Sequence, residues 1–250
     1  MSAPQAPVAL ITGGSRGIGL AIARRFLSDG YRVLITGRDR ESLAAAASQL
    51  GAGAAIEAGD VAIRADVERI AAAAAAHYAH VDVLVNNAGI LETVCLGAPL
   101  AEAEAIFDRV VDVSLKGAFL MAHALAPILA GPGGRIINIG SNFGEIAFKG
   151  RSVYAAAKAG VHHLSRALSL EWAKDGVLVN VVAPCITETE SRKNILERPG
   201  YKEWATKEMI PRGRWNQPED LVGAVLFLSS PLADMVVGHV LMVDGGWTIH

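Results

Sequence analysis

Short apolar runs alternate with longer helical stretches along the 250-residue chain. Each run is bounded by polar or turn-forming residues and is apolar almost throughout. Such runs are typical of parallel β-strands that are covered on both faces of a sheet. The pattern predicts seven strands, at residues 8–12, 32–36, 54–58, 81–85, 135–139, 177–182 and 240–243.

The stretches between these runs are predicted to be helices. They run from the glycine-rich turn to residue 28, and then lie at residues 41–50, 63–79, 100–129 (one long or broken helix), 152–174 and 218–229. Strands that alternate with helices form βαβ units, which predicts an α/β fold with a doubly wound, mainly parallel sheet and helices on both faces, a Rossmann fold. No linker interrupts the alternation, so residues 1–250 are predicted to form a single domain.

One segment, residues 187–214, departs from this alternation. It is polar and contains Pro199-Gly200 and Pro211 between a strand and a helix. Long insertions of this kind often carry binding functions, so we predict a lid over the substrate. Because its acidic and basic residues are mixed, a solvated amphipathic helix is the alternative.

Composition and charge limit the possible functions. Apolar residues make up 52% of the chain and charged residues 19%, as in folded globular proteins, and a net charge of −2 offers no basic surface for nucleic acid or anionic membrane. No uncharged apolar stretch of ~20 residues predicts a membrane span, and the first residues do not form a signal peptide. We therefore expect a soluble cytoplasmic protein with neither nucleic acid nor a membrane as its partner.

The cysteines and histidines predict neither a disulfide framework nor a metal site. Cys95 and Cys185 are the two cysteines, which fits a reducing compartment. The seven histidines form no paired ligand motif. His162 and His163 are adjacent and diverge on a helix, so we predict packing or surface roles for them.

A glycine-rich turn follows the first predicted strand and opens the first predicted helix. Glycines here allow a tight turn and let backbone N–H groups approach a phosphate at a helix N-terminus. The spacing, Gly-x-x-x-Gly-x-Gly, differs from the common dinucleotide motif but has the same strand–turn–helix context. The residues predicted to contact a dinucleotide are Gly13, Ser15, Arg16, Gly17, Ile18 and Gly19.

The second strand ends at Thr36-Gly37-Arg38, where an NAD-preferring fold usually carries an acidic residue for the ribose 2′-hydroxyl. Arg38 and Arg16 instead suit a 2′-phosphate, because guanidinium groups match phosphate oxygens. We therefore predict NADP rather than NAD. The alternative is two surface arginines with Asp39 as a local partner.

Tyr154 and Lys158 stand four residues apart in the helix predicted at 152–174. Both side chains would leave the same face, one turn apart. A free tyrosine has a pKa near ~10, and a nearby positive charge lowers it toward a useful value for general acid/base chemistry. The pair is a candidate catalytic dyad.

Together these residues resemble the short-chain dehydrogenase/reductase family, from Val8 to about Trp247. The matching motifs are Thr12-Gly-x-x-x-Gly-Ile-Gly19, Asn86-Asn-Ala-Gly89, Ser141, Tyr154-x-x-x-Lys158, Asn180 with Ala183-Pro184, and Val243-Asp-Gly-Gly246. Each motif is modest alone, but their order and spacing are specific. The resemblance implies an NAD(P)-dependent oxidoreductase of carbonyl and secondary alcohol groups.

The resemblance also implies the residue roles. Tyr154 would exchange a proton with the substrate oxygen, Lys158 would lower the tyrosine pKa and bind the nicotinamide ribose, and Ser141 would donate a hydrogen bond to the substrate oxygen. Substrate would contact Ser141, Asn142, Tyr154 and Cys185. Further implied cofactor contacts are Asp60, Val61, Asn87, Ala88, Gly89, Pro184, Thr187 and Thr189, together with Tyr154 and Lys158.

The chain departs from the family at two positions of the expected site. Ser114 stands where members usually carry an asparagine that holds a water, and a hydroxyl offers fewer hydrogen bonds, so its catalytic role is a weaker prediction. Cys185 follows Pro184 in place of a usual glycine. It would narrow the pocket or contact substrate, or be a tolerated small side chain.

Within the family, a 3-oxoacyl-thioester reductase is the leading expectation, and a sugar or polyol dehydrogenase is the close alternative. A non-catalytic NADP-binding sensor or scaffold is the alternative of another class. The resemblance also implies a homo-oligomer, a tetramer or a dimer, built on the fourth and fifth helices and the last strand.

Overall fold

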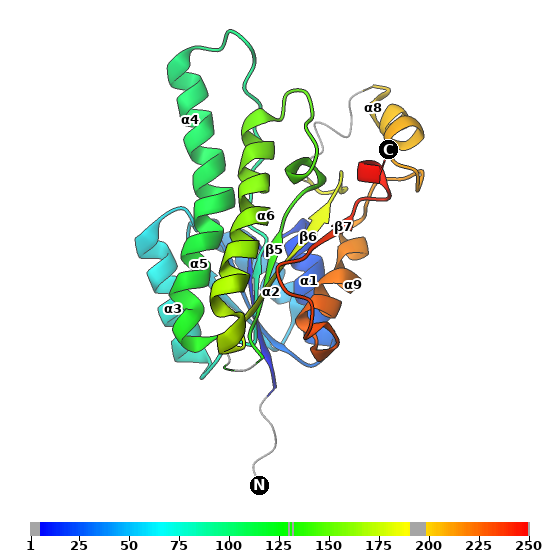
Figure 1. The fold of residues 1–250 in the computed structure, drawn as a ribbon. Helices are drawn as coiled ribbons and strands as arrows, with labels where there is room; N and C mark the ends of the chain where they lie inside the picture. The colour runs from blue at the N-terminus through cyan, green and yellow to red at the C-terminus, as the bar shows by residue number, and fades with distance from the viewer. Residues whose placement is uncertain (1–5, 130, 132, 191–198, 250) are drawn as a thin grey trace.

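The computed structural model describes residues 6–129, 131, 133–190 and 199–249 and contains one seven-stranded parallel sheet. The strand order is β3-β2-β1-β4-β5-β6-β7, and all carboxyl ends lie at the same edge, the upper one in Figure 1. The strands are β1 (Val8–Thr12), β2 (Arg32–Gly37), β3 (Ala54–Ala58), β4 (Val83–Asn86), β5 (Arg135–Ile139), β6 (Leu178–Pro184) and β7 (Val240–Val243). The predicted fold class is confirmed, and every strand pair is parallel.

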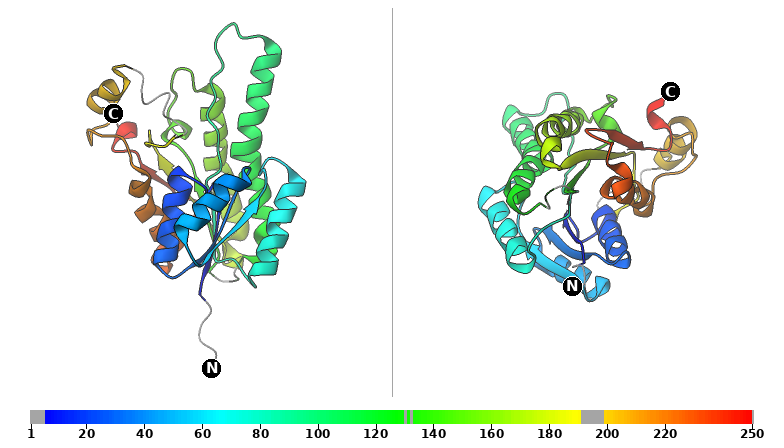
Figure 2. Two further views of the ribbon diagram at one scale, coloured as in Figure 1. Left: turned by 180° about the vertical axis from the view of Figure 1, so that it is seen from behind. Right: turned by 60° about the horizontal axis from the view of Figure 1, so that its bottom comes forward.

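Helices cover both faces of the sheet (Figure 2). One face carries α1 (Gly17–Ser28), α2 (Arg40–Leu50) and α9 (Pro218–Ser229), and the other carries α3 (Arg64–His77), α4 (Leu100–Val111), α5 (Gly117–Leu125) and α6 (Ser152–Trp172). Asp39 caps α2 by accepting from the backbone N–H groups of Glu41 and Ser42, and Pro218 begins α9. These two helices therefore start with ordinary capping chemistry.

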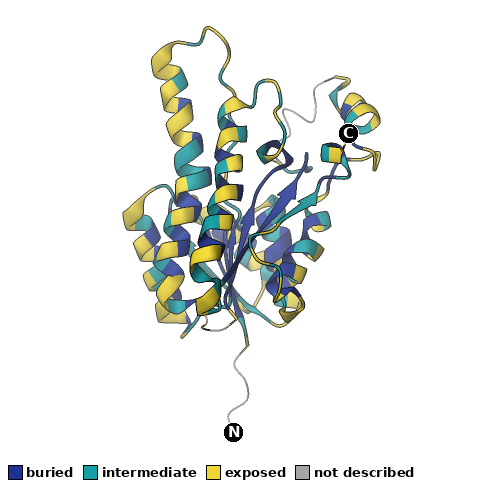
Figure 3. Ribbon diagram, in the orientation of Figure 1, coloured by how far each residue is buried: buried dark blue, intermediate teal, exposed yellow. Residues whose placement is uncertain are grey.

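The core consists of two apolar layers separated by the sheet. Alternate residues of β1 face opposite sides, so Ala9 and Ile11 pack with α1, α2 and α9, whereas Val8 and Leu10 pack with α3, α5 and α6. All five residues of β1 are buried, as the continuous apolar run predicts. Figure 3 shows the buried sheet between helices whose outer faces are exposed.

The stretch predicted as one long or broken helix is broken. A π-helical turn, η1 (Asp112–Lys116), joins α4 to α5, and a 3-10 turn, η2 (Ala126–Ile128), ends the segment. By length and composition alone, residues 100–128 are apolar enough to cross a membrane. Met121, Ala122 and Leu125 of this stretch are buried against the sheet.

Three predicted strands differ at their ends, and β2 does so only by continuing to Gly37. β4 begins at Val83 instead of Val81, because Val81 forms an isolated bridge with Leu129 and the Asp82 carboxylate accepts from the backbone N–H of Val8. β6 extends to Pro184, which brings the last residues of the strand to the edge where the site is expected.

The segment predicted as a lid, residues 187–214, lies beyond the carboxyl end of β6. Its described part contains a short helix, α8 (Tyr201–Trp204), followed by a π-helical turn, η6 (Ala205–Met209). Residues 191–198 of this segment lie outside the described part of the chain. The lid function stays a prediction.

Candidate active site

The site begins where the connections from the sheet diverge. β1 lies between β2 and β4, so the chain leaves β1 toward one side and returns to form β4 on the other. Crevices at such switch points are the usual ligand sites of doubly wound sheets. Thr12 Oγ1 accepts from the N–H groups of Asn87 and Ala88, both at 3.0 Å, and Asn87 Nδ2 donates to Gly13 O at 3.0 Å. The ends of β1 and β4 are therefore fixed together.

The glycine-rich turn is a backbone cradle. Gly13 and Gly17 have φ angles of 63° and 54°, which favour glycine. A Cβ at Gly19 would lie 2.3 Å from Gly13 O. The turn leads directly into α1, with Arg16 at the N-cap. A cradle that no side chain fills, at the N-terminus of a twelve-residue helix, fits the pyrophosphate of a dinucleotide.

The other predicted members of this turn surround the cradle. Ser15 is half-buried in the turn, and Ile18 packs against the apolar layer beneath α1. A Cβ at Gly17 would lie 3.0 Å from Thr189 Cγ2, so the start of the predicted lid reaches the glycine turn. The structure thus brings residues 13–19 and Thr189 together.

Arg16, the N-cap of α1, and Arg38, which directly follows β2, are both exposed. Neither guanidinium has a salt-bridge partner among the described residues, although Arg16 lies near the Asp39 carboxyl. The pKa of Asp39 is lowered mainly by its hydrogen bonds to Ser42 and Glu41 at the start of α2. Asp39 is therefore committed to capping α2, and two arginines stay available for a phosphate.

Asp60 and Val61 follow β3 at the same edge. Asp60 accepts from the Ala62 N–H at 2.9 Å, and its own N–H donates to Asp66 Oδ2 at 2.8 Å. Val61 is buried and contacts the helix at Gly117, where a Cβ would lie 2.7 Å from Val61 Cγ2. These contacts hold both residues beside the crevice.

Tyr154 and Lys158 are buried on the inner face of α6, at 5% and 4% exposure. Lys158 Nζ donates to Ile139 O at 2.6 Å and lies 5.9 Å from the centre of the Tyr154 ring. Ser141 follows β5 and is also buried. The helix that carries the dyad is thus fixed to the strand that leads to Ser141.

Ser114 occupies the π-helical turn and points inward, with 3% exposure. A Cβ at Gly89 would lie 3.5 Å from Lys158 Nζ and 3.6 Å from Ser114 Oγ. Ser114 Oγ also accepts weakly from the Ile90 N–H at 3.5 Å. Gly89, Lys158 and Ser114 therefore lie close together.

Beyond β6, Cys185 and Thr187 are buried at 4% and 1% exposure. Thr187 Oγ1 donates to Cys185 O at 3.2 Å, and Thr187 pairs with Asn216 through an isolated parallel bridge. Pro184, the last residue of β6, directs this strand extension toward the site. The thiol of Cys185 lies in the same apolar cluster as Tyr154.

That cluster is rich in aromatic rings and surrounds Tyr154 and Cys185, two residues predicted to contact substrate. Phe143 stacks on Phe148 with ring centres 5.0 Å apart and meets Trp247 edge-on at 5.8 Å. Phe148 also contacts Trp204 of α8, with ring centres 6.1 Å apart. Aromatic packing therefore joins the loop after β5, the predicted lid and the C-terminal segment.

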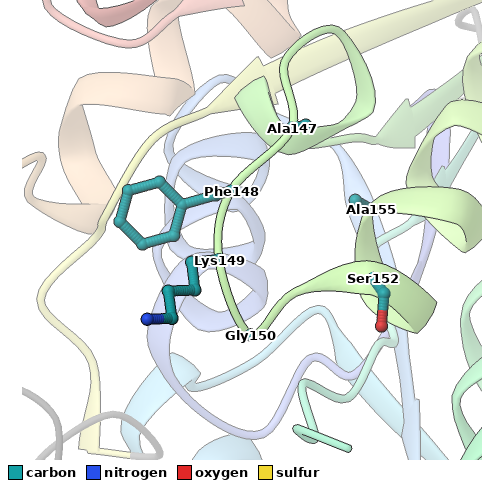
Figure 4. A pocket seen from close by; sticks show the side chains of 6 residues that line it. All are labelled: Ala147, Phe148, Lys149, Gly150, Ser152 and Ala155. Atoms are coloured by element: carbon teal, nitrogen blue, oxygen red, sulfur yellow. The ribbon is translucent and has the colours of Figure 1, made fainter. Parts of the chain in front are cut away.

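A surface pocket of about 530 Å³ borders this cluster (Figure 4). One wall is the loop after β5 and the other is the first turns of α6. Its lining residues are Ala147, Phe148, Lys149, Gly150, Ser152 and Ala155. The predicted catalytic side chains are not among them, so this pocket adjoins the site without containing its chemistry.

Asn142 lies directly beside Ser141 and is completely buried. Its Oδ1 accepts from Ser141 Oγ at 3.3 Å, whereas its Nδ2 has no hydrogen-bond partner among the described residues. An unpaired buried amide is costly unless a ligand satisfies it. Within the described chain, no group of three His, Cys, Asp or Glu side chains could hold a metal ion.

His162 makes a contact that the sequence did not predict. His163 is exposed, as a surface role requires, but His162 is buried at 1% exposure and its Nε2 accepts from the backbone N–H of Ser141 at 3.4 Å. The only signal in the sequence is its position one turn after Lys158, on the face that carries the dyad.

Comparison with known proteins agrees with this geometry. The family model described as enoyl-(acyl carrier protein) reductase matches residues 13–248. The chain is 40% identical to a galactitol 2-dehydrogenase (L-tagatose-forming) from Cereibacter sphaeroides, over 96% of this chain and 94% of that protein. The chain belongs to the short-chain dehydrogenase/reductase family. As a member of this family, it is a nicotinamide-dependent oxidoreductase of alcohol or carbonyl groups.

Two further members show how wide the range of substrates among relatives is. The chain is 35% identical to a 3-oxoacyl-[acyl-carrier-protein] reductase from Synechocystis sp., with 98% of each chain covered. A gluconate 5-dehydrogenase from Burkholderia cenocepacia was solved in complex with NADP and tartrate. Its structure matches that of this short-chain dehydrogenase/reductase with a TM-score of 0.91 at 35% identity. The match covers 99% of this chain and 97% of the gluconate dehydrogenase chain.

Proposed function

We propose that this short-chain dehydrogenase/reductase uses NADP(H) to interconvert a secondary alcohol and a ketone on a polyhydroxylated substrate, such as a polyol or sugar acid. The observation that carries the proposal is the buried amide of Asn142, beside Ser141, whose Nδ2 has no hydrogen-bond partner in the described part of the chain. A second oxygen of the substrate would satisfy that donor. The 40% identity to a galactitol dehydrogenase supports the same class.

In this proposal the reacting oxygen is held by Ser141 Oγ and exchanges its proton with the Tyr154 hydroxyl. The positive charge of Lys158 favours the phenolate form of Tyr154. Ser114 provides a hydroxyl next to Lys158, where proton exchange with solvent would begin. When bound, the nicotinamide supplies or accepts the hydride at the substrate carbon. Cys185 borders the substrate as part of the apolar cluster around Tyr154.

A 3-oxoacyl-thioester reductase is the second candidate. It is supported by the 35% identity to such a reductase and by the apolar and aromatic cluster at the substrate end. The mixed charges of segment 187–214 offer no net positive surface for an acidic carrier protein. The meeting of Gly89, Lys158 and Ser114 beside a buried Tyr154 argues against a non-catalytic sensor, which has no need for these groups.

The test measures turnover of a polyol and sugar-acid panel with NADP⁺ and of 3-oxoacyl thioesters with NADPH. Tyr154→Phe removes the proton-exchanging hydroxyl and is expected to lower kcat at least ~100-fold on the true substrate. Faster turnover of 3-oxoacyl thioesters than of any polyol would select the second candidate. Full activity of the phenylalanine variant would refute the role of Tyr154.

The choice of NADP rests on Arg16 and Arg38. Removing one charge-assisted hydrogen bond to a 2′-phosphate costs ~1.5–3 kcal/mol, so Arg38→Ala should raise KM for NADPH by about 10- to 100-fold. KM for NADH should hardly change, since that cofactor has no 2′-phosphate. Arg24→Ala, an exposed arginine elsewhere on the surface, is the control. Equal KM values for NADH and NADPH in the unmodified enzyme would overturn the assignment.

We also propose a homo-oligomer that uses α4, α5 and α6. Phe107, Phe119 and Leu170 on these helices are exposed at 49%, 41% and 83%, and a subunit contact would remove this apolar surface from water. The last strand, β7, pairs only with β6 among the described strands, so its other edge is free for a second contact.

A further inference from the structure

The loop that carries Ser141 packs against an imidazole of α6 that the proposed catalytic scheme does not use. His162 is buried beneath the residues 140–144, and its Nε2 accepts from the Ser141 N–H at 3.4 Å. On its other side, His162 Nδ1 lies 2.9 Å from Glu145 Oε1. Glu145 comes from the same loop, so the imidazole links two residues that flank the 3-10 turn η3 (Asn142–Gly144).

Two glycines make room for this imidazole. A Cβ at Gly140 would lie 2.3 Å from His162 Nε2, and a Cβ at Gly144 would lie 2.5 Å from His162 Cε1. Both distances are shorter than any ordinary contact, so alanine at either position would displace the ring. The absence of a side chain at Gly140 and Gly144 therefore allows the His162 ring to pack directly against this loop.

The two contacts define one tautomer. The backbone N–H of Ser141 can only donate, so Nε2 must be unprotonated. The Glu145 carboxylate accepts, so the proton belongs on Nδ1. Burial lowers the pKa of His162 and outweighs the opposing effect of Glu145, while Lys158 and Arg166 lower it further, so the ring stays neutral at neutral pH.

One face of α6 fixes the chain at Ser141 and two residues before it. Tyr154, Lys158 and His162 are spaced four residues apart on α6. Lys158 holds Ile139 O and His162 holds the Ser141 N–H. The helix that carries the tyrosine is thereby fixed to the chain immediately before and at the serine. A fixed separation between two groups that must reach one substrate oxygen is a requirement for efficient catalysis.

We infer that His162, oriented by Glu145, is a positioning residue that holds Ser141 at the correct place relative to Tyr154. The inference rests on the proposed role of Ser141 as a donor to the substrate oxygen. His162 does not contact the reacting atoms, and it acts only through the serine backbone.

The test compares His162→Leu with His162→Gln. Leucine fills similar space without an acceptor and is expected to lower kcat by about 10- to 100-fold, with dinucleotide Kd unchanged. Glutamine offers an amide oxygen near the position of Nε2 and should restore most of kcat. His163→Leu, the adjacent exposed histidine, should behave as the unmodified enzyme, with the assembly state of each variant checked by light scattering.

A double-mutant cycle shows whether the effect passes through Ser141. If it does, His162→Leu should cost little when Ser141→Ala is already present. Equal losses of kcat in both backgrounds, or no loss from His162→Leu in the unmodified enzyme, would overturn the inference. Wild-type kcat in Ser141→Ala alone would instead refute the proposed role of Ser141, and the inference would fall with it.

A spectroscopic measurement on the unmodified protein tests the contact of His162 with Ser141 even if the leucine variant does not fold. Correlation of imidazole ¹⁵N and ¹H signals in the unmodified protein reports which ring nitrogen of His162 carries the proton. The Nδ1-protonated tautomer is expected, and it should be lost or mixed in Glu145→Ala. An Nε2-protonated tautomer would place a donor against the Ser141 N–H and would refute the arrangement.

Discussion

Gly19 and Gly223 are both helical glycines with different surroundings. A Cβ at Gly19 would lie 2.3 Å from Gly13 O, whereas a Cβ at Gly223 meets no atom within 4 Å. Gly19→Ala should therefore lower the free energy of unfolding by ~1–3 kcal/mol and weaken dinucleotide binding, since the cradle must open. Gly223→Ala should raise the free energy of unfolding by ~0.5–1 kcal/mol.

Urea unfolding and dinucleotide titration of both variants measure these effects. If Gly19→Ala were as stable as Gly223→Ala and bound the dinucleotide normally, the glycine turn would not be the cradle that its geometry indicates.

Single residues also show what a sequence can reveal about this site. Tyr154, Lys158 and the glycine turn are visible because their spacing is local. The contact of His162 with Ser141 is not, because the imidazole fits only where Gly140 and Gly144 leave room, about twenty residues away along the chain. The unpaired amide of Asn142 is equally invisible, since its partners are known only once the loop is folded.

At the level of elements, apolar runs predict strands well because burial on both faces leaves an unbroken pattern. The π-helical turn between α4 and α5 is different. It depends on close packing at Gly117 against Val61 and at Gly160 against Leu115, which are tertiary contacts. The extent of the helical stretch at residues 100–129 can therefore be predicted from hydropathy. The π-helical turn that points Ser114 inward cannot be predicted in this way.

The predicted lid is joined to the body by a polar latch. Glu188 accepts from Lys202 of α8 at 2.5 Å and from Gln217 at 2.6 Å, and Lys202 also lies 4.9 Å from the Trp215 ring centre. These hydrogen bonds, that of Lys202 first, lower the pKa of Glu188. The latch is thus fully present at neutral pH and is lost only as pH falls through that lowered pKa.

Lys202→Ala should open this latch. We expect KM for substrate to rise about threefold to tenfold with little change in dinucleotide Kd, because partly exposed ion pairs are worth roughly 1 kcal/mol. Hydrogen exchange at α8 should also become faster. The control is Lys207→Ala, which removes an exposed pair with Glu203 within the same segment. Identical exchange and KM in the two variants would show that segment 199–214 is not held by Glu188.

On the scale of the molecule, strand order determines where the chemistry lies. The glycine turn lies where the strand order switches between β1 and β4, and β5, β6 and α6 bring Ser141, Cys185 and Tyr154 to the same edge. The helices α4, α5 and α6 lie on the face of the sheet opposite to α1, α2 and α9. Their outer surfaces point away from the sheet (Figures 1 and 3). Assembly through these surfaces would leave the crevice accessible.

The last prediction concerns that assembly. A carboxylate at an apolar subunit contact must be desolvated, so Phe119→Glu should shift the protein to a smaller species. Ala52→Glu adds the same charge at an exposed turn between α2 and β3 and should leave the assembly unchanged. Sedimentation velocity of the two variants and the unmodified protein measures the change. If Phe119→Glu sediments as the unmodified protein does, the subunit contact does not include this surface, and the free edge of β7 becomes the place to mutate next.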